Sequence, residues 1–330
     1  MATLTSDALY DALMRALTAA GFSFENAAAL ARQTVLSEEL GQRNVGVAHI
    51  FDYTDGLAAG RIDGVAVPTI SNPAPAMIHV DGNGGLPQTG FDQAYDDLIA
   101  GARQLGLCVF LQKNTTLCGP LGTFALRIAE AGLLGFAATN GSPLLAGSGA
   151  TRPVFCTNPI AFSAPQDNGP PLLIDQSSSA TAYVNIRAAA ERGDDIPLDW
   201  AVDKDGQPTT DPKAALAGAM LAFGGARGAN IALMVDVLAG GLTGANWSLD
   251  APSFVSGNEC PATGLFVLAI NPMPADPSFA GRMARQLKRL SQDYKVHIPG
   301  LSKARARRRS VNDGIVIDDA TMMRLQAMSG

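Results

Sequence analysis

The sequence predicts an α/β protein with a large, mostly apolar core. Three short apolar runs, at 107–111, 134–138 and 172–175, have the length of strands buried inside a sheet. A helical pattern at 123–131 lies between the first two runs, and strands that alternate with helices are typical of an α/β sheet. Hydrophobic residues make up 47% of the chain and charged residues 16%, which supplies such a core and excludes a disordered protein.

The other elements are predicted from the spacing of apolar residues and from signals that end helices. The segment 6–40 reads as two amphipathic helices with a break at Gly21-Phe22-Ser23, where Ser23 is a suitable cap for the second helix. Because 330 residues exceed what one compact core usually holds, we expect two or more lobes. The further expected elements are helices at 91–105, 229–239 and 279–290 and a strand at 265–270.

Charge and composition narrow the partners that this chain can have. The net charge of −6 gives no attraction to nucleic acid or to anionic membranes. One local exception is the basic run Lys303–Arg309, which is either a solvated surface or an anion contact. No apolar stretch reaches the roughly 20 residues of a membrane helix, and the first residues lack a signal-peptide pattern. Four cysteines without a disulfide pattern fit the reducing cytoplasm, where we expect the protein.

Several common functional motifs are missing from the sequence. No G-x-G-x-x-G follows a strand, so an ordinary Rossmann dinucleotide site has no support. There is no Walker-type phosphate loop and no G-x-S-x-G nucleophile elbow. His49, His79 and His297 are not at metal-ligand spacing, and we expect no metal site. Pattern rules alone therefore stop at an α/β protein that is an enzyme of unspecified chemistry.

Five segments together resemble a known oxidoreductase family. The order and spacing of these segments are similar to those of the type-2 malate/L-lactate dehydrogenases from about residue 40 to the C-terminus. His297-Ile298-Pro299-Gly300, followed by the basic run, is most similar to the branch that reduces cyclic imines such as Δ1-piperideine-2-carboxylate. The segments that carry the family resemblance are Cys156–Phe162, Ile196–Asp203, Gly206–Pro212, Phe223–Gly228 and Leu238–Gly244.

The resemblance implies a fold, a cofactor and an assembly. The implied fold is the non-Rossmann, L-sulfolactate dehydrogenase-like α/β fold, with a mixed-sheet cofactor domain at 106–274. A second, helical substrate lobe is expected from both chain ends, at 1–105 and 275–330. The implied cofactor is NADPH or NADH, and the implied partner is a second copy of the chain, in a homodimer with active sites near the subunit interface.

The family's first motif, S-H-G-V-x-R-x-x-x-Y, corresponds to Asn44–Tyr53 of this chain. Val45 stands in place of the family histidine and cannot transfer a proton, while His49 stands in place of the substrate-binding arginine. The resemblance makes Asn44 and Tyr53 candidates for substrate binding. His49 is a candidate catalytic residue, or binds a carboxylate when protonated.

Two other interpretations of His49 stay open. An alternative alignment sets His49 on the family's histidine, but it breaks the spacing to Tyr53 and Gly60. In the other interpretation, His49 is a packing or helix-terminus histidine without a chemical role.

The second motif, N-S-x-H-F-G-x-x-G, corresponds to 114–122, where Leu117 replaces the family histidine. Thr115 keeps a hydroxyl, and Gly119 and Gly122 suit a close approach of the backbone to a cofactor phosphate. The same glycines also fit a plain strand-to-helix turn. Cys118 is either a small buried hydrophobic residue or a nucleophile of the site.

The third motif, D-x-A-T-S, corresponds to 175–179. Asp175 is the residue we expect to act as the acid, or to orient a proton-donating water, provided that burial raises its pKa. The alternative is that Asp175 only hydrogen-bonds a turn. Ser177 is assigned to cofactor binding, and Val184 replaces a family glycine where it would crowd the cofactor's ribose.

The remaining polar residues of the similar segments complete the expected site. Thr139, Asn140 and Thr157 are candidates for holding substrate, and Asn158 and Pro159 for holding the cofactor. Further cofactor candidates are three cations that suit the 2′-phosphate of NADP, namely Arg227, Lys303 and Arg305. Gly300, which precedes the basic run, is also a cofactor candidate.

Three functions are consistent with these residues. The first is NAD(P)H-dependent reduction of a small cyclic imino acid, Δ1-piperideine- or Δ1-pyrroline-2-carboxylate, or of a related 2-oxo acid. An imine nitrogen is easily protonated before hydride arrives, so the reaction can tolerate the replacement of two family histidines by Val45 and Leu117. The altered motifs leave open a cofactor-independent lyase or isomerase of a related amino or hydroxy acid, and a catalytically inactive paralogue.

Overall fold

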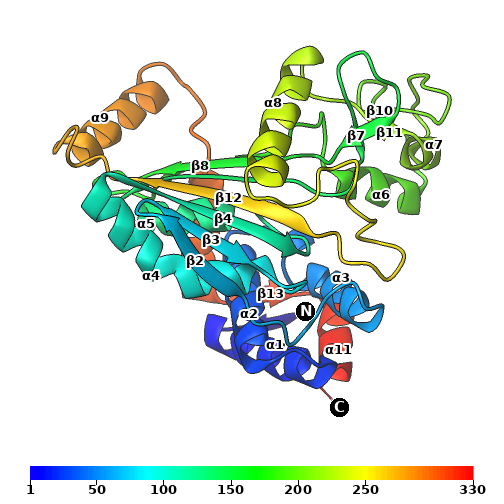
Figure 1. Cartoon of the computed structure of the whole chain (residues 1–330), viewed down its shortest axis with the longest axis horizontal. Coiled ribbons are helices and arrows are strands. Elements are labelled where there is room, and N and C mark those ends of the chain that lie inside the picture. The colour runs from blue at the N-terminus through cyan, green and yellow to red at the C-terminus, as the bar shows by residue number, and fades with distance from the viewer. Residues whose placement is uncertain (330) are drawn as a thin grey trace.

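A seven-stranded mixed sheet forms the centre of the molecule in the computed structural model, which describes residues 1–329 (Figure 1). The pairing of β3 with β4 is parallel and every other pairing in this sheet is antiparallel. In spatial order the strands are β2 (Thr69–Ala74), β3 (Met77–Asp81), β4 (Leu107–Thr115), β12 (Thr263–Ile270), β5 (Leu134–Thr139), β8 (Ile160–Ala164) and β9 (Leu172–Gln176).

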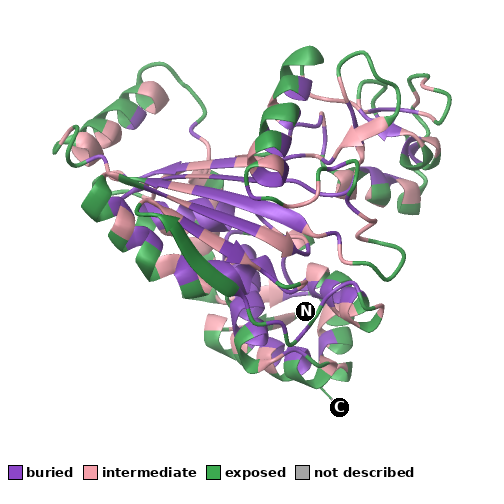
Figure 2. Cartoon of the chain, viewed as in Figure 1, coloured by how far each residue is buried: buried purple, intermediate pink, exposed green. Residues whose placement is uncertain are grey.

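Helices cover the two faces of this sheet unequally. The helices α4 (Pro87–Leu105) and α5 (Gly122–Glu130) cover one face, and α8 (Ala226–Asp236) with the π-helical segment η2 (Val237–Gly241) covers part of the other. Side chains alternate along β4, so that Phe110 packs under α4 and α5 while Leu111 faces α8. Figure 2 shows that the middle strands, above all β12, are buried along most of their length.

Both chain ends meet in a second, helical core. Strand β1 (Ala2–Leu4) pairs antiparallel with β13 (Ile315–Ile317). The predicted break between the first two helices is confirmed, because Gly21 has φ +110° and Ser23 Oγ accepts from the Asn26 backbone N–H. The helices of this core are α1 (Ser6–Ala20), α2 (Phe24–Glu39), α3 (Val47–Ala58) and α11 (Asp319–Ala327), with the 3₁₀ turn η1 (Arg43–Val45) before α3.

A smaller four-stranded sheet lies beside α8. Ile186, Ile196 and Met220 are among the residues of its own apolar cluster. In spatial order its strands are β10 (Ala201–Val202), β11 (Ala219–Met220), β6 (Leu145–Ala146) and β7 (Pro153–Phe155), and its helices are α6 (Tyr183–Arg192) and α7 (Pro212–Ala217).

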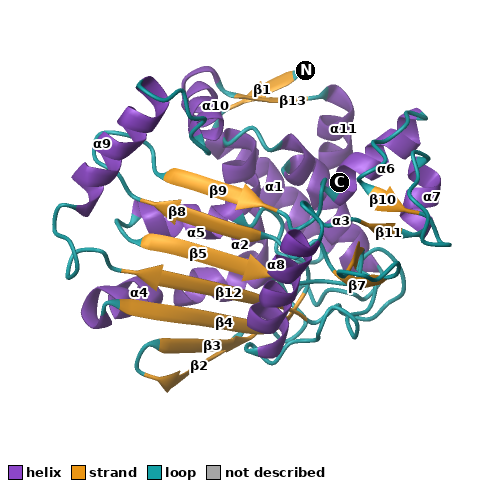
Figure 3. Cartoon of the chain, turned by 90° about the horizontal axis from the view of Figure 1, so that it is seen from above, coloured by secondary structure: helices purple, strands orange, loops and turns teal. Residues whose placement is uncertain are grey.

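Two helices near the C-terminus complete the fold. Helix α9 (Phe279–Gln292) projects beyond the end of the large sheet (Figure 1). The basic run forms α10 (Leu301–Asp313), which packs against α2 and lies near β1 and β13 (Figure 3). The basic run is therefore a helix that packs on the rest of the protein, and some of its cations form ion pairs with acidic residues of this chain.

The expected fold class is confirmed, with differences at the edges. All predicted strands and helices are present within a few residues, but many other elements, among them β2, β3, α3, α6 and α10, were not predicted. Strands β2 and β3 lie within the segment assigned to the terminal lobe, yet they hydrogen-bond into the large sheet. The two-lobe division of the chain stays a prediction. Within residues 1–329, no helix has the length and apolar content needed to cross a bilayer.

Candidate active site

A cavity of about 240 Å³ lies where α3, the chain after β4, α6 and the 254–261 segment meet. Helix α3 contributes His49 and Tyr53, both expected at the site, and the chain after β4 contributes Leu117. Those three residues come from the first two motifs, so the structure brings these motifs together. The other lining residues are Asp52, Asp55, Gly56, Arg61, Ile62, Thr116, Arg187, Phe254, Val255 and Pro261.

His49 and Asp52 form a hydrogen-bonded pair at this cavity. They are three residues apart on α3, and His49 Nδ1 lies 2.6 Å from Asp52 Oδ2. Burial opposes the ionisation of Asp52, but the hydrogen bond and charge of His49 outweigh it and hold the pKa of Asp52 below its usual value. Asp52 therefore fixes the imidazole ring and leaves Nε2 as the nitrogen that can exchange a proton with a ligand.

Tyr53 is fixed in a buried network. Its side chain is 4% exposed, its hydroxyl donates to the Leu117 carbonyl oxygen at 3.1 Å, and Gln88 Nε2 donates to it at 3.2 Å. Burial raises the pKa of Tyr53, so the phenol stays neutral. Gly119 has φ +66°, and a Cβ there would lie 3.1 Å from the Tyr53 hydroxyl. The glycine thus makes room for this network, and Tyr53 orients the chain at Leu117.

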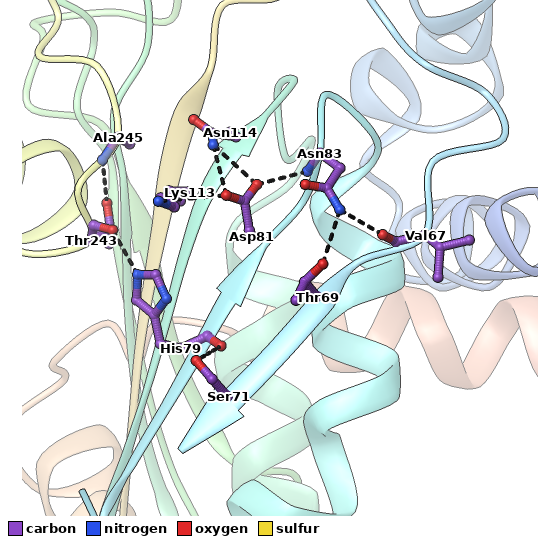
Figure 4. A network of polar contacts seen from close by, with 10 residues as sticks. All are labelled: Val67, Thr69, Ser71, His79, Asp81, Asn83, Lys113, Asn114, Thr243 and Ala245. Atoms are coloured by element: carbon purple, nitrogen blue, oxygen red, sulfur yellow. Dashed lines mark hydrogen bonds and ion pairs between the residues drawn. The ribbon is translucent and has the colours of Figure 1, made fainter. Parts of the chain in front are cut away.

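A second polar network sets the direction of the chain at the end of β4 (Figure 4). Asn114 has φ +55°, and its Nδ2 lies 3.0 Å from each carboxylate oxygen of Asp81. Asp81 also accepts from the Asn83 backbone N–H and pairs with Lys113 at 3.5 Å. Burial is outweighed by these donors, which lower the pKa of Asp81. The network holds the left-handed turn that carries the next residues, including Leu117, into the cavity.

Asp175 lies in a different environment from His49. Its Oδ2 accepts from Lys303 Nζ at 2.8 Å and from Gln42 Nε2 at 3.3 Å, and its side chain is 13% exposed. A Cβ on Gly122 would lie 2.6 Å from the same oxygen, so that glycine leaves room for the carboxylate. Asp175 is not among the described residues that line the His49 cavity. The structure therefore pairs two expected site residues, Asp175 and Lys303, but at a separate place.

Cys118 has the properties of a packing residue. It is 5% exposed and belongs to the main apolar cluster. Burial raises the pKa of the Cys118 thiol to about 12, so almost no thiolate forms near neutral pH. The interpretation of Cys118 as a small buried hydrophobic residue is the one that these properties favour.

Several predicted polar residues hold the protein together rather than facing a cavity. Thr115 donates to the Thr263 carbonyl oxygen, and Thr139 to that of Gly264. The Asn140 side chain donates to Asp236 Oδ1 and accepts from a backbone N–H. The remaining expected residues in this group are placed as follows: Ser177 Oγ donates to the Ser179 carbonyl oxygen, Asn44 is exposed, and Thr157 and Pro159 are half-buried.

Asn158 is the exception in that region. It is fully buried, its Nδ2 donates to the Ala232 carbonyl oxygen at 2.7 Å, and its Oδ1 has no hydrogen-bond partner within residues 1–329. Buried polar atoms are nearly always paired, so an unpaired oxygen beside half-buried Thr157 and Pro159 is consistent with a ligand contact.

A glycine-rich cleft of about 610 Å³ lies at the start of α8. Gly149, Gly224 and Gly225 line it, all with positive φ and with nothing within 4 Å of an added Cβ. Glycine is therefore favoured at these positions by the left-handed backbone conformation and not by close packing. Arg227 lies in the first turn of α8 and is exposed, which places a cation and free helix N–H groups beside the cleft. A cation and helix N–H groups beside a glycine-lined cleft are features that can bind a phosphate group.

The candidates on α10 are used in different ways. Gly300 has φ +86° and packs on β9, where a Cβ would lie 2.9 Å from that of Leu173. Lys303 is paired with Asp175, and Arg305 is exposed. Arg307, which was not singled out, pairs with Glu39 Oε2 at 3.1 Å and with Glu130.

Sequence reasoning missed four charged residues of the cavity, namely Asp52, Asp55, Arg61 and Arg187. Asp52 lies one helical turn after His49, a spacing that indicates contact once α3 is known. Arg61 and Arg187 belong to none of the similar motifs, and their only sequence signal is their charge.

Comparison with known proteins gives consistent similarities over the whole chain. The model of the malate/L-lactate dehydrogenase family matches residues 4–326. A Δ1-pyrroline-2-carboxylate/Δ1-piperideine-2-carboxylate reductase from Pseudomonas syringae pv. tomato is 34% identical over 99% of this chain and 96% of the relative. A (2R)-3-sulfolactate dehydrogenase (NADP(+)) from Chromohalobacter salexigens is 32% identical over 94% of this chain and 93% of the relative.

Solved structures show the same similarity in three dimensions. The Δ1-piperideine-2-carboxylate reductase from Pseudomonas syringae pv. tomato superposes with a TM-score of 0.95 at 34% identity, covering 99% of this chain and 100% of the other. The sulfolactate dehydrogenase from Methanocaldococcus jannaschii superposes with a TM-score of 0.84 at 27% identity, covering 99% and 96%.

Proposed function

Because the chain belongs to the malate/L-lactate dehydrogenase family, a family of oxidoreductases, we propose that it reduces a small cyclic imino acid with a nicotinamide cofactor. The proposed substrates are Δ1-piperideine-2-carboxylate and Δ1-pyrroline-2-carboxylate, or a related 2-oxo acid. The observation that carries the proposal is the cavity of about 240 Å³ with the His49–Asp52 pair in its wall. Pockets for drug-sized ligands span about 300–1,000 Å³, so this one suits a smaller molecule.

We propose that His49 supplies the proton to the imine nitrogen. Val45 and Leu117 cannot transfer protons, whereas histidine exchanges a proton readily near neutral pH. Asp52, at 2.6 Å, acts as a positioning residue that holds the ring. Asp175 remains the alternative donor, and because it lies outside this cavity, that role would place the substrate near the end of β9.

The proposed cofactor is NADPH or NADH, held by the glycine-rich cleft and by Asn158. When bound, it supplies the hydride that reduces the carbon of the C=N bond. Arg227 beside the cleft and Arg305 on α10 are exposed cations that favour NADPH through its additional phosphate.

We also propose that the protein is a homodimer of the cytoplasm. Leu233 and Met234 on α8 and Val237 at the start of η2 are 44–50% exposed. An exposed apolar strip of this kind is typical of a subunit interface. All four cysteines are unpaired, as expected in a reducing compartment.

The test begins with fluorescence titration of the purified protein with NADPH and NADH. Saturable binding is expected, tighter for NADPH, followed by loss of nicotinamide absorbance when a cyclic imino acid is added. Absence of binding to either nucleotide at millimolar concentration would contradict the reductase proposal. It would direct attention to a cofactor-independent lyase or isomerase.

A further inference from the structure

Arg61 is a buried cation that the protein itself leaves incompletely paired. It follows α3, lines the His49 cavity and is 7% exposed. Its Nη1 donates to the Gly257 carbonyl oxygen at 2.8 Å. Its Nε is covered from solvent and has no hydrogen-bond partner within residues 1–329.

Such an arrangement is unfavourable unless a ligand completes it. A buried donor on a charged group loses its hydration and gains nothing in return. Natural proteins satisfy nearly all such groups, and each exception calls for an explanation such as a functional role or a bound water or ion. Since Arg61 lies in the wall of a cavity, a small shift of its guanidinium would allow a ligand in the cavity to supply the missing partner.

We propose that Arg61 binds the carboxylate of the substrate, an inference that rests on the proposed reduction of a cyclic imino acid. A guanidinium offers two parallel N–H groups to a carboxylate, and this bidentate geometry gives both strength and orientation. Gly257 anchors Nη1, which leaves Nε and Nη2 as the pair of donors. Binding entails a small shift of the guanidinium, because Nε is covered by its own neighbours.

The other charges of the cavity are less suited to this role. Asp52 is engaged by His49, so it does not neutralise Arg61. Asp55 and Arg187 are exposed, and water screens their interactions with a ligand. A carboxylate beside buried Arg61 is in a less polar environment, where the same attraction is several times stronger.

This assignment also accounts for the substitution at His49. The similar family motif has an arginine at that position, whereas here the histidine takes a proton-donating role. Arg61 then supplies the cation from a neighbouring position, and the two functions are divided between two residues of one cavity.

The experiment compares wild type, Arg61→Met, Arg61→Lys and the control Arg103→Met in steady-state reduction of Δ1-piperideine-2-carboxylate. Arg103 is the control, because it also donates to one backbone carbonyl oxygen, that of Ala131, but is exposed and lies outside the cavity. Arg61→Met is expected to raise KM by about tenfold to a hundredfold with kcat changed less than about threefold. Arg61→Lys is expected to fall between, and Arg103→Met to match wild type.

Two further measurements separate binding from folding and from the proposed function. Arg61→Met should bind NADPH and melt like Arg103→Met, and it should treat Δ1-piperideine, which lacks the carboxyl group, as wild type does. An unchanged KM for the imino acid in Arg61→Met would overturn the assignment and leave the proposed reductase standing.

If wild type turns over no imino acid, the proposed reductase fails while the assignment remains testable. Thermal shift with the carboxylate L-pipecolate and its neutral amide then decides. A shift by the carboxylate alone, lost in Arg61→Met, supports Arg61 as the carboxylate-binding residue. An equal shift in both variants, or none in wild type, overturns it.

Discussion

At the scale of single residues, substitution of Asp175 tests whether this carboxyl group or His49 donates the proton. It accepts from Lys303 at 2.8 Å and lies outside the His49 cavity. Because His49 is the proposed proton donor, we expect Asp175→Asn to lower kcat by less than about tenfold, whereas a loss of about a hundredfold or more, the usual contribution of an acid–base residue, would favour Asp175 as the donor. The measurement is steady-state reduction alongside a thermal melt.

The companion variant Lys303→Met separates chemistry from anchoring. If Asp175 serves only to hold α10, Asp175→Asn and Lys303→Met should lower kcat and the melting temperature by similar amounts. A selective loss in Asp175→Asn supports a chemical role. Full activity in Asp175→Asn would remove Asp175 from the site and leave His49 as the proton donor.

At the scale of elements, the end of β4 depends on one carboxylate. Asp81 accepts from Asn114 and Asn83, and its pKa is lowered because these donors favour the charged form more than burial disfavours it. A lowered pKa gives stability that is present above the unfolded value, about 3.9, and is lost as pH falls through the folded value. Asp81→Asn should therefore destabilise the protein by about 1–3 kcal/mol at pH 7.

The pH dependence of this effect is the diagnostic result. The difference between wild type and Asp81→Asn in urea-unfolding free energy should begin to shrink below about pH 4 and should disappear only below the lowered pKa of the folded protein, where the wild-type carboxyl group is neutral. Asp205→Asn, which removes an exposed partner of Lys204, serves as the control and should change little. A constant difference across pH would show that the charge of Asp81 does not hold this turn.

Predictability also differs between elements. The strands at 107–111 and 265–270 were found because buried strands are continuous apolar runs. Strand β2 was missed because all of its residues are exposed at the sheet edge. Helix α10 was missed because ion pairs such as Lys303–Asp175 hold it, and these leave no apolar period in the sequence.

The candidate site was predictable only in part. Resemblance led to His49, Tyr53 and Leu117, which share a cavity, because these positions belong to ordered motifs. Arg61 carries no local signal, since its importance comes from burial and from an unpaired Nε, both of which need tertiary structure. The glycines of 114–122 were identified from the sequence as a place for a cofactor phosphate. In the structure, Gly119 makes room for Tyr53 and Gly122 makes room for Asp175.

At the scale of the whole molecule, the proposed homodimer depends on the exposed side of α8. Leu233 is 50% exposed there, and a charge in an apolar interface is costly. We expect Leu233→Asp to convert the dimer into a folded monomer in light scattering after size exclusion. The control is Leu105→Asp on α4, on the opposite face of the sheet and 46% exposed, which should remain dimeric. A dimeric Leu233→Asp protein would place the interface elsewhere.

The pairing of β1 with β13 has a consequence for how the newly made chain folds. Leu9 and Leu13 pack in the same cluster as Ile315, Ile317 and Leu325. At about 5–20 residues per second, a ribosome reaches those last residues on the order of 15–60 s after the first helix is made. During that time the apolar faces of the first helices lack their packing partners from the C-terminal segment. The core formed by both chain ends can therefore be completed only after the last residues have been made.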